Sequence, residues 1–292
     1  MEKNLARLLM LVFLLTIGIS NSVSAYTIDG DLTDWGLKSL VTDDWSVNET
    51  WVPDKGIRFL VEDNHNPNHS GISGVHIKGV GDSYTFYDEP LMTKCNTGNP
   101  ISEPYGNEPY DLEAMYFVQD TDYFYVAIVS SLLPDGGGDL RPGDLALNLD
   151  NDMTTGNLGY EYGVKIHQDP EQGYIIKDPV WDAKGYLCPV GPDIIKSGTG
   201  TYAGIAEISY NRLWLTKQDN GYDNYVIEMC INKSDVNVTG SVSFSSLRVT
   251  DNCINEHISY VPEFPGIAVS LALIIGSIFA VHVIHSRKKD KM

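Results

Sequence analysis

Basic residues are scarce in this sequence, and the scarcity excludes one large class of partners. The chain has 20 Lys and Arg against 39 Asp and Glu, which gives a formal net charge of −19 at pH 7. A nucleic-acid-binding protein needs a basic face that neutralises phosphates, so we exclude nucleic acid as a partner. An acidic chain suits calcium ions or a salty exterior instead.

Motifs of nucleophilic catalysis and phosphate binding are missing as well. The chain has neither a GxSxG elbow nor a P-loop, and no two cysteines have the CxxC spacing of zinc sites. We therefore predict that the protein is not an enzyme. One alternative stays open, a polysaccharide-acting enzyme, because sequence positions do not give the separation that a glycosidase carboxylate pair requires.

Cysteine is rare, and the chain contains only Cys95, Cys188, Cys230 and Cys253. An even number of cysteines in an exported chain predicts two disulfides. Four cysteines allow three pairings. We favour the one that joins Cys230 to Cys253, since each ends a β-rich run and one long hairpin would bring them together.

The N-terminus carries the features of an export signal. Residues 8–19 are almost entirely apolar, but this run is too short to span a bilayer. A weakly basic start precedes the run, and Val23 and Ala25 supply the small residues of a cleavage site. We predict a signal peptide at 1–25, which signal peptidase removes before Tyr26. The alternative is a buried N-terminal helix.

A second apolar run lies near the C-terminus, at 266–284. At about 1.5 Å per residue, a helix of this length matches a hydrocarbon core of about 30 Å. Basic residues follow at 287–289, and such residues mark the cytoplasmic side of a span. We predict an exported protein that a transmembrane helix holds at the cell surface, with its ectodomain outside.

A short motif, Pro262-Glu263-Phe264-Pro265, stands directly before this apolar run. Motif, span and basic tail together resemble the PEF-CTERM sorting signal of archaeal envelope proteins, which would occupy 261–292. The resemblance implies that an archaeosortase cuts near the motif and joins the new C-terminus to a lipid anchor, as in the logic of a GPI signal. An ordinary single-pass anchor is the alternative.

The intervening residues, 26–260, read as an all-β ectodomain. Short runs of aromatic and β-branched residues alternate with clusters of Gly, Pro, Asn and Asp, which favours a single β-sandwich, although the length also fits two small domains. Residues 36–110 are rich in loop residues, and we interpret them as an elaboration of the sandwich. A slip of hydrophobic phase at Ser245-Ser246 predicts a β-bulge.

Particular strands can be predicted from the same patterns. The run 123–129 is apolar throughout, as in a strand covered on both faces, whereas 162–167 alternates and predicts a strand with one wet face. A short helical turn is expected at 210–215. Further strands are expected at Ile57–Val61, Leu145–Leu149, Ala203–Ile208 and Tyr225–Ile231.

Segments in this order resemble the family-9 carbohydrate-binding modules and the related DOMON-like sandwiches. They are an opening strand and turn at 26–35, a hairpin with an Asp-rich turn at 115–128, a strand, acidic turn and strand at 143–163, and a later strand and turn at 206–210. The resemblance implies a sandwich that binds sugar between paired aromatic side chains. No tryptophan of this chain matches those aromatic positions.

Two acidic turns are candidate calcium sites, since Ca²⁺ takes six to eight oxygen ligands. Asp29, Asp31 and Asp34 form one group, and Asp150 and Asp152 form the other. The EF-hand spacing is absent. The same residues are also the ordinary residues of tight turns that need no ion.

Aromatic and amide side chains supply further candidate sites. Tryptophans in expected loops either stack on a sugar ring or pack in the core; they are Trp45, Trp51 and Trp181. Asn-x-Ser/Thr sequons, candidates for glycosylation in an exported chain, occur at Asn48, Asn68, Asn232 and Asn237.

These features together predict a non-catalytic surface module that binds glycan or matrix, with a possible structural calcium. An envelope structural or adhesion protein that binds other proteins is the alternative.

Overall fold

The computed structural model describes residues 26–37, 51–63, 75–88, 112–130, 143–167, 170–182, 192–213, 224–243, 247–250 and 257–259. The predicted signal peptide (1–25), the sorting motif Pro262–Pro265 and the predicted span (266–284) lie outside these residues, as does the predicted bulge at Ser245-Ser246. Within the described ranges, no helix is long and apolar enough to cross a membrane.

The described residues form two large antiparallel sheets, so the predicted all-β class is confirmed. One sheet has the order β12-β13-β5-β4-β1-β2-β3, with strands Glu207–Leu213, Asn224–Asn232, Tyr123–Ser130, Leu112–Gln119, Arg58–Asp63, Val75–Val80 and Ser83–Asp88. The other has the order β11-β8-β7-β6-β14-β15, with strands Thr201–Ile205, Tyr174–Lys177, Tyr162–Val164, Leu145–Leu147, Leu247–Thr250 and His257–Ser259. A two-stranded ribbon joins β9 (Trp181–Asp182) to β10 (Ile194–Ile195).

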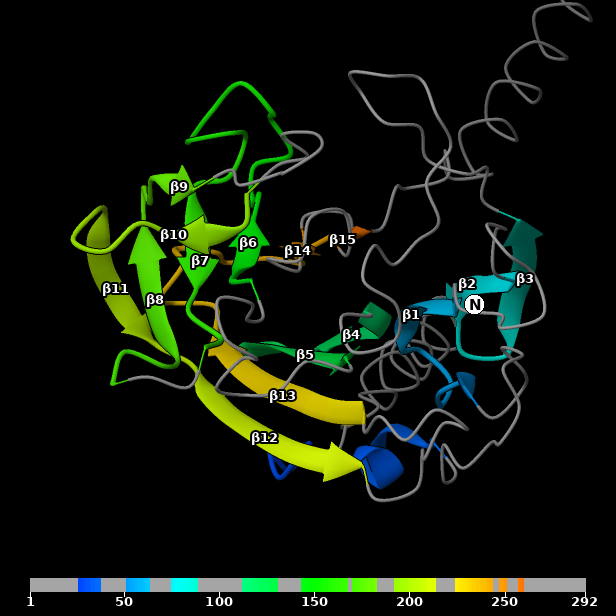
Figure 1. The fold of residues 1–292 in the computed structure, drawn as a ribbon. Helices are drawn as coiled ribbons and strands as arrows, with labels where there is room; N and C mark the ends of the chain where they lie inside the picture. Colours follow the sequence, from blue (N-terminus) through cyan, green and yellow to red (C-terminus); the bar gives the residue numbers. More distant parts are fainter. Residues whose placement is uncertain are drawn as a thin grey trace, which may run out of the picture.

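The two large sheets share one hydrophobic core, which is the arrangement of a β-sandwich. Phe117 and Phe124 enter this core from β4 and β5, while Val164 and Ile175 enter it from β7 and β8. Figure 1 shows β12, β13 and β5 side by side, with β8, β7 and β6 above them.

A second apolar layer covers the outer face of the seven-stranded sheet. The N-terminal segment ends in a 3-10 turn, η1 (Leu32–Trp35), whose Trp35 side chain is fully buried against that face. Trp51 and Ile57 join the same cluster from the segment before β1. Covered in this way, β5 is buried along nearly its whole length, as predicted for 123–129.

A third, smaller cluster lies on the outer face of the six-stranded sheet. Trp181 of β9 and Ile195 of β10 pack there against Ile176 of β8. This cover corrects the expected wet face of 162–167, because the indole of Trp181 lies over Gly163, which is buried. The packing there is so close that an added Cβ on Gly163 would come within 2.5 Å of the Trp181 ring.

Other expectations also differ from the structure. The segment 36–110, expected to be loop-rich, contributes β1, β2 and β3 to the larger sheet. Residues 26–31 form an irregular segment with a bend at 29–30 rather than an opening strand. The helical turn expected at 210–215 is wrong at its start, since residues up to Leu213 continue β12 through cross-strand pairing with β13.

Candidate ligand-binding site

A pocket of about 440 Å³ opens on the outer face of the six-stranded sheet, beside the third cluster. Strands β8 and β11 form one side, and the loop that follows β10 forms another. Its lining residues are Lys165, Glu171, Tyr174, Ile176, Ile195, Lys196, Gly198, Thr199, Gly200 and Tyr202. None of them stands in a sequence motif that predicts a site.

Two tyrosines supply the aromatic surface of this pocket. Tyr174 and Tyr202 lie edge to face, with ring centroids 5.2 Å apart and an interplanar angle of 74°. Tyr202 is 57% exposed and is therefore accessible to a ligand. Tyr202 pairs across the strands with Ile176, two residues from Tyr174, so both tyrosines lie on one face of the sheet, and the register shifts beyond Tyr202.

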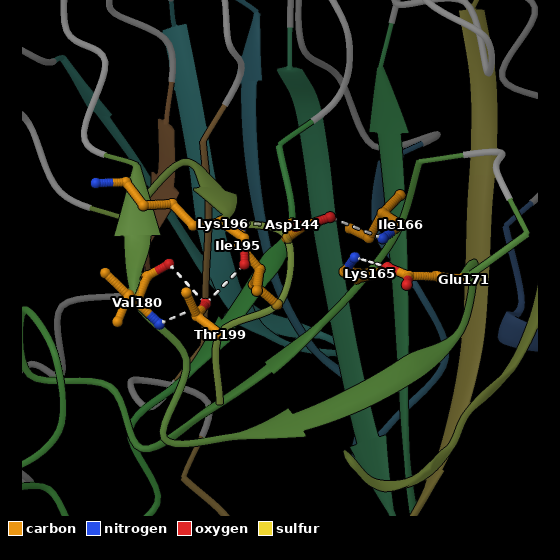
Figure 2. Close-up of polar contacts among 8 residues, drawn as sticks. All are labelled: Asp144, Lys165, Ile166, Glu171, Val180, Ile195, Lys196 and Thr199. Carbon is orange, nitrogen blue, oxygen red and sulfur yellow. Dashed lines mark hydrogen bonds and ion pairs between the residues drawn. The ribbon is translucent and has the colours of Figure 1, made fainter. Parts of the chain in front are cut away.

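A charged pair occupies the end of the pocket next to β7. The ammonium of Lys165 forms an ion pair with the carboxylate of Glu171 (Figure 2). The Lys165 side chain is only 12% exposed, whereas that of Glu171 is 48% exposed. The pair therefore presents a fixed donor and a solvent-facing acceptor to the pocket.

The loop of residues 196–200 forms the opposite wall. The Thr199 hydroxyl donates to the Lys196 carbonyl at 2.6 Å and accepts from the Val180 amide at 3.2 Å. The Lys196 amide donates to the Val180 carbonyl at 2.9 Å. Figure 2 shows the bonds of the Thr199 hydroxyl, and the bonds with Val180 tie the loop to the residue before β9.

Asp144 joins the two sides of the pocket. Its buried carboxylate accepts from the Ile166 amide at 3.1 Å and from the Ile195 amide at 2.8 Å. Ile166 follows Lys165, and Ile195 precedes Lys196, so one side chain fixes the positions of both lysines (Figure 2). Asp144 contacts the backbone of the walls and acts as a positioning residue.

A second buried carboxylate lies on the other sheet, away from the pocket residues. Glu228 of β13 is fully buried and accepts from the Trp35 indole at 2.8 Å, the Gly30 amide at 2.9 Å and the Asp29 amide at 3.1 Å. Burial raises the pKa of Glu228 to about 7, while the three hydrogen bonds oppose the rise. This group fastens the N-terminal segment to the sheet.

The first acidic turn forms a network of hydrogen bonds with its own backbone. Asp29 accepts from the Asp31 amide, Asp31 from the Thr33 amide, and Asp34 from the Thr27 amide, at 2.9 to 3.0 Å. Burial, with the nearby carboxylates of Asp29 and Asp31, raises the pKa of Asp34. These contacts are those of Asx-turns and a helix cap.

The second acidic turn, between β6 and β7, has the same character. Asp150 accepts from the Asp152 amide and the Thr155 hydroxyl, both at 2.8 Å, and Asp152 accepts from the Thr154 amide. In the part of the chain that the structure describes, no three His, Cys, Asp or Glu side chains come together as a metal site. Calcium binding at either turn stays a prediction.

The tryptophans predicted to stack on a ligand do not fit that role where they are described. Trp51 and Trp181 are buried, in the second and third apolar clusters respectively, because each lies on the inner side of a covering segment and packs against a sheet. Trp45 lies outside the described residues. The exposed ring at the pocket belongs to Tyr202 instead, and its signal in the sequence is an aromatic residue in a glycine-rich turn region.

The cysteine and sequon predictions meet the structure only in part. Cys230 is a half-buried free thiol, so the expected bridge to Cys253 is not formed in the structure; Cys95, Cys188 and Cys253 lie outside the described residues. Asn48 and Asn68 lie outside them too. Asn232 accepts from the Ser234 amide at 3.0 Å, while the Asn237 amide group donates to the Tyr162 hydroxyl at 2.9 Å. Glycosylation stays a prediction for all four.

Comparison of the chain with protein-family models, with curated proteins and with solved structures gives no match.

Proposed function

We propose that the protein is a non-catalytic module that binds glycan at the Tyr174–Tyr202 pocket and is displayed on an archaeal cell surface. The observation that carries the proposal is the exposed ring of Tyr202 beside a hollow of about 440 Å³. That volume lies within the range of small-molecule sites, about 300–1,000 Å³. An aromatic face next to fixed polar groups suits a sugar ring, which has apolar C–H faces and hydroxyl edges.

The two ends of the chain supply the proposed location. Signal peptidase would release the chain at Tyr26, and an archaeosortase would process Pro262–Pro265 to leave a lipid anchor, or the span 266–284 would remain as the anchor. Either ending leaves the pocket outside the cell. A structural calcium at the acidic turns belongs to the same proposal.

A glycan array with the full chain, purified from membranes in detergent, tests the binding function. We expect binding to at least one oligosaccharide, and the Tyr202→Ala variant should bind it roughly three- to tenfold more weakly, since an aromatic contact contributes about 0.5–1.5 kcal/mol. Tyr123→Ala is the matched control, because Tyr123 is an exposed tyrosine of the other sheet. Absence of binding across the array would remove the glycan function.

A specific observation also supports the alternative of an adhesion or coat protein that binds other proteins. Strand β11 is at the edge of its sheet, has no charged residue and exposes Tyr202 and Ile205 at 57% each. An uncharged edge strand is suited to pairing with a strand of another chain. Binding of envelope proteins that depends on Ile205, in a protein that binds no glycan, would favour this function.

A further inference from the structure

We propose that the pocket recognises a uronic acid, whose carboxylate binds Lys165 in place of Glu171. The inference rests on the proposed glycan-binding function and names the class of sugar. Lys165 and Glu171 form an ion pair, so the ammonium already has a carboxylate as its partner. A ligand carboxylate of the same charge and shape can replace it.

Lys165 has the properties of a fixed binding group. Its backbone amide donates to the Tyr174 carbonyl at 3.0 Å, and its carbonyl accepts from the Gly173 amide at 2.8 Å. The side chain is 12% exposed, and an ammonium with so little water around it needs an anionic partner. When Glu171 leaves this position, the Lys165 ammonium therefore needs another anion as its partner.

Glu171 has the properties of an exchangeable group. It lies in the turn of residues 170–173, two residues before Gly173, which has a left-handed φ of 81°, and its side chain is 48% exposed. A carboxylate near the surface regains its hydration when it turns outward, and the ligand carboxylate then takes over the charge pairing with Lys165. Displacement of Glu171 by a bound carboxylate is thus inexpensive in free energy.

The rest of the pocket fits the same ligand. Lys196 is the other charged residue among the described lining residues, so the pocket carries two cations when Glu171 turns outward. This balance contrasts with the whole chain, in which acidic residues outnumber basic ones by 39 to 20. Tyr202 offers its ring to the pyranose, and Lys165 meets the carboxylate at the edge of that ring.

Isothermal titration of the full chain in detergent provides the test. The probes are short oligomers of galacturonate, glucuronate and mannuronate, each compared with its neutral hexose oligomer at pH 7. We expect at least one uronate oligomer to bind tenfold or more tightly than its neutral counterpart. Lys165→Gln should abolish the preference, whereas Lys55→Gln, a change of an exposed lysine outside the pocket, should preserve it.

A second variant tests the exchange without removing the lysine. Glu171→Gln should raise the affinity for the uronate severalfold and leave the affinity for the neutral oligomer unchanged. Uronate binding that is unaffected by both variants would overturn the inference, as would equal affinity for uronate and neutral oligomers.

The outcomes separate this inference from the function on which it rests. Binding of neutral oligomers that depends on Tyr202, with no gain for uronates, would leave the glycan function standing and refute the uronate preference. Failure of every oligomer to bind would refute both. Thermal unfolding of each variant shows whether it is folded, and Glu171→Gln provides a result even if Lys165→Gln does not fold.

Discussion

The indole of Trp35 donates a 2.8 Å hydrogen bond to Glu228, a residue 193 positions later in the chain. Trp35 belongs to the covering segment and Glu228 to β13 of the seven-stranded sheet, so the bond fixes the first described segment of the chain on a strand that follows it by almost two hundred residues. The backbone amides of Asp29 and Gly30 add two more bonds to the same carboxylate. Loss of this group would leave several buried donors without an acceptor.

Replacement of Glu228 by alanine is therefore expected to lower the free energy of unfolding by roughly 2–4 kcal/mol, since unsatisfied buried polar groups cost about 1–3 kcal/mol each. Trp35→Phe should cost less through this bond, because the two amide bonds remain. Urea unfolding measures both changes. Glu207→Gln, on the neighbouring strand and exposed, is the control and should stay within about 0.5 kcal/mol of the unchanged chain.

Stability should also depend on pH through Glu228. Its pKa is raised from an ordinary value of 4.5 to about 7, mainly by burial, so the folded state holds the proton more tightly. The stabilisation is complete below pH 4.5 and is lost as the pH rises to about 7, a fall of up to ~3 kcal/mol from this group. Urea midpoints between pH 4.5 and 7.5 measure it, and Glu228→Gln should flatten the curve. If the contribution of Glu228 to the free energy of unfolding rises between pH 4.5 and 7.5, its pKa is not raised in the folded state.

Two glycines of the pocket loop allow a matched test of its wall. Gly198 and Gly200 both have a φ of 72°, but an added Cβ meets open space at Gly198 and comes within 2.5 Å of the Ile176 side chain at Gly200. Gly198→Ala should lower the free energy of unfolding by about 1 kcal/mol, which is the cost of holding alanine in the left-handed conformation. Gly200→Ala should cost more and also weaken glycan binding. Equal effects of the two changes in urea unfolding and in titration would show that the close approach is unimportant.

The positioning role of Asp144 predicts a linked loss of stability and binding. In Asp144→Asn, the amide group can accept only one of the Ile166 and Ile195 N–H bonds, which should lower the free energy of unfolding by about 1–3 kcal/mol. The two pocket walls then lose their common support, so glycan affinity should fall as well. Asp82→Asn, in an exposed turn, is the control for both measurements.

The strands of the sandwich can largely be predicted from local sequence patterns, whereas the segments that cover the outer faces of its sheets cannot. The β4–β5 hairpin, with Asp120 accepting amides in the turn, agrees with the apolar run at 123–129 and with the Asp-rich turn that the family resemblance implied within 115–128. Trp181 reads as a loop aromatic because its sequence neighbours do not show that it packs over Gly163. Burial by a covering segment depends on contacts between residues far apart in the sequence, whereas the periodicity of hydrophobic residues depends only on local structure.

The pocket was missed for a related reason. Tyr174 and Tyr202 lie on different strands, and the pairing of Tyr202 with Ile176 that makes them neighbours cannot be inferred from spacing. Glu228 did leave a signal, since it is an acidic residue inside the apolar run 225–231. A charge at such a position indicates a buried partner, although its identity as Trp35 depends on the fold.

One residue, Ala206, separates β11 of the six-stranded sheet from β12 of the seven-stranded sheet, and its amide donates to Gly173 in the turn that carries Glu171. Tension applied at Tyr202 thus passes within a few residues into β12, which β13 holds along seven paired positions. Those hydrogen bonds run across the direction of pull and share the load, rather than opening one after another. A force on the pocket is in this way transmitted to the seven-stranded sheet on the other side of the core.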